Sequence, residues 1–177
     1  MSSSCRRILS CSLFKELGVL VGVYAGFRML FFFAPGLKGL LFIQPTGYLV
    51  EFFWGTGVLD RGEWIYQAGD LRIRFGELCS GTTFFSLLSA YTAMKCVTRR
   101  LSVEWLAACY PLTLLTNAAR VLCSMYVYAY SAQRLSAEFN EYLHLALGVT
   151  VFALSFIALT LFWERKTAGD DLGSATN

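Results

Sequence analysis

Charged residues are scarce in this sequence, and long apolar runs are frequent. Of the 177 residues, 15% are charged and 56% are hydrophobic, whereas about a quarter of a soluble domain is charged. This balance excludes an ordinary soluble domain and predicts an integral membrane protein. The net charge of +3 is small and no basic block is interleaved with aromatic residues, so we expect no nucleic-acid partner.

The sequence also lacks the patterns of a metal or redox site. Its six cysteines, at positions 5, 11, 79, 96, 109 and 123, include no CxxC pair, and the chain has a single histidine, at position 144. Zinc sites and thioredoxin-like motifs depend on such pairs. We therefore expect no metal and no cofactor, and we interpret most of the thiols as small apolar packing residues.

Four apolar runs are long enough for membrane helices, which need about 20 residues each. They cover residues 17–34, 78–98, 105–133 and 142–163. Lys and Arg gather before the first run, between the second and third, and after the fourth, so the positive-inside rule places both termini in the cytoplasm. The sequence predicts one all-α integral membrane domain, residues 1–163, and a disordered polar cytoplasmic tail, residues 164–177.

The segment between the first two runs is expected on the outer face. Residues 35–59 are partly apolar but are interrupted by charges, prolines and glycines, which predicts an amphipathic or re-entrant segment rather than a fifth span. Residues 64–67 and 71–74 alternate apolar and polar side chains around a turn, which predicts a short outer β-hairpin. Two strands are marginal alone, so the hairpin should rest on the helices or be completed by a bound peptide.

Three reactive side chains occur in the last three apolar runs: Cys79, Arg120 and His144. At about 1.5 Å per residue, each lies about 30 Å from the cytoplasmic charges next to its own helix. All three should therefore lie at the outer membrane boundary. Each also has a structural interpretation: Cys79 as a packing residue, Arg120 as a residue that snorkels or binds lipid phosphate, and His144 as a polar helix end.

Neighbouring residues extend this group. Ser80 and Gly81 are small residues at a helix start, where backbone N–H groups are open to an incoming carbonyl oxygen. Asn117 precedes Arg120 by about one turn and is a candidate to orient it.

Polar residues also accompany the histidine. Asn140 and Glu141 precede His144 by about one turn and are candidates to orient its imidazole. Arg28 and Glu51 are two further charges within apolar segments. They form either an ion pair or a second polar site, and the sequence leaves both alternatives open.

The order of these motifs resembles the exosortase and archaeosortase family. Cys-Ser-Gly enters one apolar helix, Asn-x-x-Arg lies within the next, and His144 with Gly148 opens the last. The resemblance covers roughly residues 60–163. The short chain and the run Cys-Ser-Gly-Thr-Thr-Phe-Phe are similar to the small exosortase K branch, whereas larger members of the family have more spans.

The resemblance implies a membrane-embedded cysteine protease or transpeptidase of the bacterial inner membrane. Such enzymes act outside the cytoplasm on the C-terminal sorting signals of exported proteins, so the expected partners are those proteins and membrane lipid. The corresponding residues are Cys79 as nucleophile, Arg120 and His144. From the chemistry of their side chains, our hypothesis is that Arg120 holds the oxyanion and that His144 acts as general acid and base. The acceptor of the thioester, whether water, an amine or a lipid, is left open.

Two other functions remain open at this point. In a non-catalytic transport or assembly subunit, Arg120 and His144 would line a polar path and the Cys79 sulfur would be dispensable. In a membrane thiol oxidoreductase, Cys79 would pair with Cys123, which lies about one turn from Arg120. The missing CxxC motif argues against the second of these functions.

Overall fold

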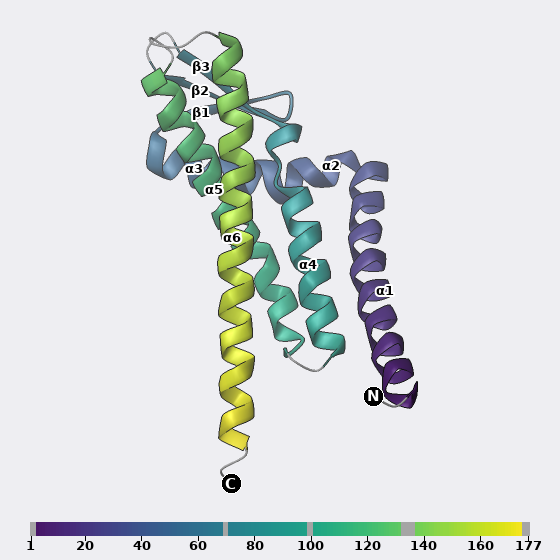
Figure 1. Cartoon of the computed structure of the whole chain (residues 1–177). Helices are drawn as coiled ribbons and strands as arrows, with labels where there is room; N and C mark the ends of the chain where they lie inside the picture. The colour runs from purple at the N-terminus through teal and green to yellow at the C-terminus, as the bar shows by residue number, and fades with distance from the viewer. Residues whose placement is uncertain (1–2, 69–70, 99–100, 132–136, 175–177) are drawn as a thin grey trace.

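Four long helices stand side by side, with a crossing helical layer and a small sheet at one end (Figure 1). The computed structural model describes residues 3–68, 71–98, 101–131 and 137–174, with side chains for 14–67, 73–98 except Leu78, 101–131, and 142–165 except His144. The long helices are α1 (Ser3–Phe33), α4 (Thr82–Val97), α5 (Glu104–Ser131) and α6 (Ala137–Ser174). The start of α1 and the end of α6 lie opposite the sheet.

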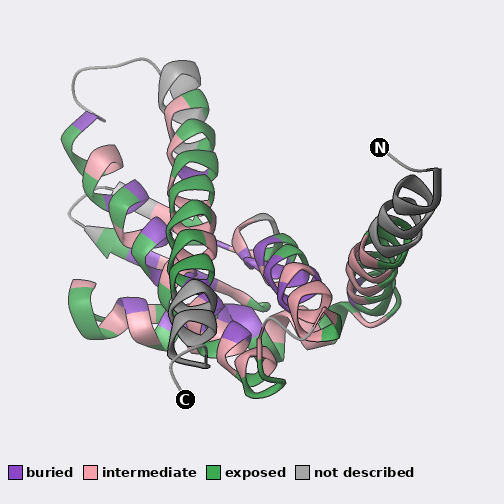
Figure 2. Cartoon of the chain, turned by 60° about the horizontal axis from the view of Figure 1, so that its bottom comes forward, coloured by how far each residue is buried: buried purple, intermediate pink, exposed green. Residues whose placement is uncertain are grey.

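Three helices are long and apolar enough to cross a membrane. The qualifying segments are Phe14–Phe33, Glu104–Ser131 and Leu145–Arg165. Most of the described surface of α1 and α6 is exposed (Figure 2), and it carries large apolar side chains such as Phe32 and Leu154. A continuous apolar surface of this kind suits helices that face lipid.

The apolar run at 78–98, expected as another span, forms the shorter helix α4 of 16 residues. Before it, a separate 3-10 turn, η2, covers Glu77–Cys79, and Gly81 has a φ of 76°. This left-handed backbone conformation does not belong to a right-handed helix, so α4 begins only at Thr82. Cys79 therefore precedes the helix, whereas the sequence pattern placed it inside the apolar run.

Residues 35–59 were expected to lie along or dip into the outer face. In the structure the first part of this segment forms a helical layer that crosses the bundle (Figure 1). It consists of α2 (Pro35–Lys38), the π-helical turn η1 (Gly39–Ile43) and α3 (Gln44–Trp54). The chain turns into it at Ala34, because a residue before proline disfavours the helical conformation. Gly55, with a φ of 109°, ends α3.

The small sheet has three antiparallel strands rather than the expected two. They are β1 (Gly57–Asp60), β2 (Glu63–Ala68) and β3 (Leu71–Phe75), in the order β1-β2-β3. The unexpected strand β1 is joined to β2 through Arg61 and Gly62, which have φ values of 49° and 86°. Two consecutive positive φ values match the twist of a two-residue hairpin. The pattern of β1 escaped notice because it is mostly exposed and lacks burial alternation.

One face of the sheet packs against α3 and α5. Trp64, Tyr66 and Phe75 are buried there, in a cluster that also includes Val50 of α3 and Val121 of α5. Tyr66 Oη donates a hydrogen bond to a carbonyl of α3 at 2.8 Å, and burial raises the pKa of Tyr66, so the phenol stays protonated as a donor. This packing fixes β3, which leads directly to Cys79.

Replacing Gly47 with alanine is expected to destabilise the fold by about 1–3 kcal/mol. A Cβ at position 47 would overlap the indole of Trp64, and Trp64 is only 3% exposed, so the sheet must move. Thermal unfolding of the purified protein in detergent measures the effect. Gly22→Ala is the matched control, since a Cβ there meets nothing within 4 Å. Equal losses of stability in both variants would contradict the prediction.

A second core joins α4, α5 and α6 further from the sheet; it contains Phe84, Leu88, Cys109 and Trp163. Near its end, Lys95 of α4 forms an ion pair with Glu164 of α6. Tyr91 Oη donates to the same carboxylate at 3.1 Å. The expected tail, residues 164–177, continues α6 as helix to Ser174, and these contacts tie its first residue to α4.

Candidate functional site

The structure brings Cys79 and Arg120 together, although they are 41 residues apart in the chain. Arg120 Nη2 lies 3.7 Å from Cys79 Sγ. Cys79 ends the turn η2 that follows the anchored strand β3, and Arg120 projects from α5 with only 7% of its surface exposed. The result is a half-buried thiol beside a buried guanidinium.

Helix α6 holds the Arg120 side chain in place. Its guanidinium carbon lies 4.9 Å from the centre of the Phe152 ring, a cation–π contact. On the next turn, a Cβ at Gly148 would lie 2.7 Å from Arg120 Nε. Glycine at 148 therefore allows α6 to approach the arginine closely. Sequence reasoning missed Phe152, although residues 144, 148 and 152 share one helix face by their spacing of four.

The third expected catalytic residue, His144, lies on α6 one turn before Gly148. Positions four residues apart share a helix face, so the backbone at 144 is on the face that meets Arg120. The side chains of His144, Asn140 and Glu141 lie outside the described residues. The structure thus joins two of the three residues and places the helix of the third beside them; contact of the imidazole with Cys79 stays a prediction.

Asn117 was expected to orient Arg120, but it holds the backbone of Cys79. Its Nδ2 donates to the Cys79 carbonyl at 2.9 Å and to Thr46 Oγ1 at 3.3 Å. The Asn117 side chain is fully buried. One amide on α5 therefore links the Cys79 carbonyl to α3 and fixes the backbone that carries the thiol.

Gly81 is the better placed of the two expected N–H donors. The Ser80 N–H already donates to the Glu77 carbonyl at 3.1 Å, whereas within the described residues no hydrogen bond occupies the N–H of Gly81. A Cβ at Gly81 would lie 2.9 Å from Asn117 Cγ. Glycine is thus required here for a positive φ and for close packing, and its N–H remains open to an incoming oxygen.

Three polar atoms on one face of α5 are buried without a hydrogen-bond partner among the described residues. They are Asn117 Oδ1, Arg120 Nε and Ser124 Oγ. Their spacing of three and four residues aligns them along the helix. Because buried polar groups are normally paired, this row indicates a capacity for a polar guest next to Cys79.

A pocket of about 230 Å³ lies at the start of α4, and its lining includes Ser80, the residue that follows Cys79. Two cations line it. Arg28 Nη1 donates to Thr83 Oγ1 at 2.9 Å, and Lys38 pairs with Glu77 at 3.6 Å. Of the two alternatives for Arg28, the structure favours the polar site, since among the described residues its guanidinium binds Thr83 and forms no ion pair with Glu51.

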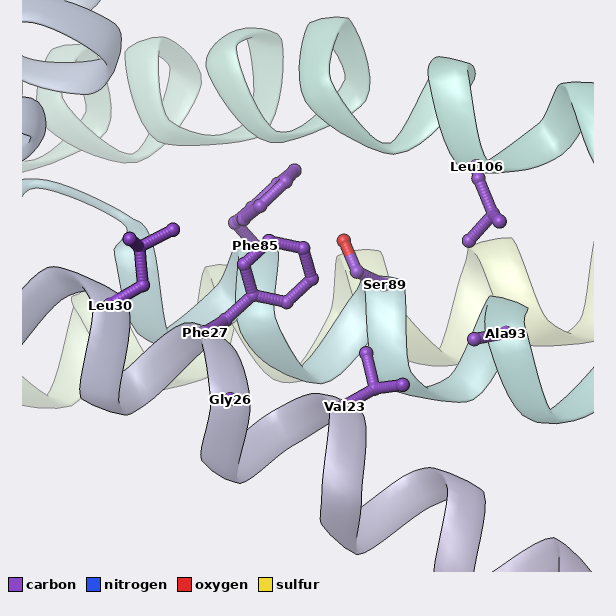
Figure 3. A pocket seen from close by; sticks show the side chains of 8 residues that line it. All are labelled: Val23, Gly26, Phe27, Leu30, Phe85, Ser89, Ala93 and Leu106. Atoms are coloured by element: carbon purple, nitrogen blue, oxygen red, sulfur yellow. The ribbon is translucent and has the colours of Figure 1, made fainter.

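A second pocket, of about 480 Å³, lies between α1 and α4 and is also lined by Leu106 of α5 (Figure 3). Phe27, Leu30 and Phe85 point into it, and Ser89 supplies the single hydroxyl of its lining. No acid, base or thiol lines this pocket.

The other cysteines with described side chains are not arranged for disulfide exchange. Cys79, Cys96, Cys109 and Cys123 form no disulfide with one another. Cys109 is buried and donates to Thr92 Oγ1 at 3.3 Å, as a packing thiol does. Cys123 is exposed on α5, whereas the Cys79 sulfur faces Arg120. This geometry disfavours the oxidoreductase interpretation.

Comparisons with family models, with curated proteins and with solved structures find no match to this chain.

Proposed function

We propose that the protein is a membrane-embedded cysteine protease or transpeptidase that cleaves C-terminal sorting signals of exported proteins. The observation that carries this proposal is the 3.7 Å approach of Arg120 Nη2 to Cys79 Sγ in a partly buried site. A sulfur beside a fixed positive group is the arrangement that acyl transfer requires. The motif order shared with the exosortase and archaeosortase family supports the same reaction class.

The chemistry begins with attack of the Cys79 thiolate on a peptide carbonyl carbon. A C–S bond forms, and the carbonyl oxygen becomes an oxyanion held by Arg120 and the Gly81 N–H. The C–N bond then breaks, and His144 gives its proton to the leaving amine. His144 next takes a proton from water or an acceptor amine, which attacks the thioester, breaks the C–S bond and restores the thiolate.

The proposed location is the bacterial inner membrane, with the site on the outer face. The three apolar helices α1, α5 and α6 would span the bilayer, and the shorter α4 would be the fourth crossing, which returns both termini to the cytoplasm. The crossing layer of α2, η1 and α3, together with the sheet, lies at the end opposite the start of α1 and the end of α6. That end would face outward, where exported proteins emerge.

Trapping the acyl-enzyme tests this function. The chain is co-expressed with exported proteins that carry C-terminal membrane anchors, and adducts are detected by mass shift. We expect a hydroxylamine-sensitive adduct on wild-type protein that is absent from Cys79→Ala. Cys123→Ala is the matched control and should keep the adduct. If wild type forms no adduct, or Cys79→Ala keeps it, the proposal fails and a non-catalytic membrane subunit becomes the better interpretation.

Gly148→Ala is expected to slow adduct formation about tenfold, because displacement of a catalytic group by about 1 Å is costly. The new Cβ would lie 2.7 Å from Arg120 Nε and push the guanidinium away from its position beside Cys79. Gly26→Ala is the control, since a Cβ there meets nothing within 4 Å. An unchanged rate in Gly148→Ala would show that the exact place of Arg120 does not matter.

A further inference from the structure

β3 is an edge strand, and among the described strands only β2 pairs with it. Leu71, at its start, pairs with the last residue of β2 across a connection of two residues. The two residues that flank a two-residue hairpin turn form main-chain hydrogen bonds with each other. Along an antiparallel ladder, hydrogen-bonded pairs of residues alternate with pairs that are not hydrogen-bonded. The N–H and C=O groups of Arg72 and Arg74 therefore point away from β2.

This edge is held rigidly. Phe75 of β3 is buried at 1% exposure, and its neighbours on β2, Trp64 and Tyr66, are 3% and 0% exposed. Their face packs on α3 and α5. Because this strand is already ordered, little of its conformational entropy is lost when a guest peptide pairs with it. The edge is therefore preorganised for binding.

The edge also leads to the nucleophile. Cys79 follows Phe75 by four residues, a reach of at most about 14 Å. A polypeptide that pairs with β3 and continues past its end would therefore come within that distance of Cys79. Arg120 of α5 lies beside the Cys79 sulfur, and its Nε, with Asn117 Oδ1 and Ser124 Oγ, is buried without a partner among the described residues. They can receive the polar main-chain groups that the guest carries beyond the end of β3.

We propose that the exported substrate binds by β-strand addition, with the segment before its scissile bond paired to Arg72 and Arg74 of β3. This inference rests on the proposed function and adds the way in which the peptide is held. The outward N–H and C=O groups of β3 can form hydrogen bonds with the main chain of an extended peptide. The exposed Arg74 disfavours a second copy of the chain as the guest, because two such edges would bring like charges together.

A proline substitution tests the pairing without removing a bond to β2. Arg74→Pro deletes the outward N–H at position 74, and proline is tolerated at an outward-facing edge position. We expect adduct formation on Cys79 about tenfold slower, the value of one main-chain hydrogen bond. Leu59→Pro is the matched control, because by the same alternation the Leu59 N–H points outward from β1, on the opposite edge. It should leave the rate unchanged.

Hydrogen exchange on wild type gives a second measurement that needs no variant. The acyl-enzyme retains the part of the substrate before the scissile bond. We expect amide exchange at Arg72 and Arg74 to slow at least about tenfold in the acyl-enzyme, with no change at Leu59.

The outcomes separate the two proposals. Equal rates in Arg74→Pro and Leu59→Pro would overturn strand addition while the adduct still supports the enzyme. If Arg74→Pro fails to fold, unchanged exchange at Arg72 and Arg74 in the acyl-enzyme would overturn it instead. If wild type forms no adduct, the proposed function is wrong, and the proposed binding of substrate by strand addition is then wrong as well.

Discussion

Replacing Arg120 with lysine is expected to lower the rate of adduct formation on Cys79 by about 10²- to 10³-fold, the cost of losing one oxyanion donor. Lysine keeps the charge but not the planar fork of donors. In the structure Arg120 Nη2 faces Cys79 Sγ, while the guanidinium carbon lies 4.9 Å from the centre of the Phe152 ring. An ammonium group cannot keep both contacts, so we expect it to leave the position where the oxyanion develops.

The measurement is the single-turnover rate of adduct formation at saturating substrate. Arg165→Lys is the matched control, since Arg165 is exposed on α6, and it should behave as wild type. Thermal unfolding of Arg120→Lys separates a lost fold from a lost rate. Full activity in a folded Arg120→Lys variant would rule out the oxyanion role and leave Arg120 as a structural cation.

Asn117→Asp is expected to lower kcat about 10²-fold while KM stays within about twofold, because a misplaced catalytic group affects the transition state more than binding. The substitution keeps the shape of the side chain. A carboxylate, however, cannot donate to the Cys79 carbonyl, which now accepts a 2.9 Å hydrogen bond from Nδ2. Two acceptors would face each other in a fully buried place, so the backbone at Cys79 must shift.

Thr46→Val separates the two hydrogen bonds of Asn117. It removes the longer contact, 3.3 Å, and keeps the bond to Cys79, so its kcat should fall less than about threefold. A purely structural role for Asn117 would lower the amount of folded protein in both variants without changing kcat per folded molecule. A rise in KM alone in Asn117→Asp would place this residue in substrate binding.

Apolar periodicity and length were sufficient to predict the long helices. Residues 17–34 lie within α1 except for the last one, residues 142–163 lie within α6, and residues 105–133 coincide closely with α5. The shorter α4 was harder to foresee, because the left-handed φ of Gly81 depends on its packing against Asn117. Strand β1 was missed for a different reason: its exposed side chains carry no alternation.

The helical rise per residue placed Cys79 and Arg120 at the same depth in the membrane. It gave no information on the lateral distance between the two side chains. That distance depends on which helix faces pack, and it is determined here by Gly148 and Phe152 of α6 against Arg120. The role of Asn117 was misassigned because residues one turn apart were expected to touch. In the structure its amide reaches across to η2, a long-range contact that spacing cannot show.

The length of α4 has a consequence for the surrounding lipid. Its 16 residues extend roughly 24 Å, about 6 Å less than the hydrocarbon thickness of a typical bilayer. In a bundle embedded as proposed, with Lys95 among the cytoplasmic headgroups, the Cys79 end of α4 stops below the opposite headgroup layer. The bilayer must thin there or admit water, so turnover is expected to depend on acyl-chain length and to be fastest in short-chain lipids.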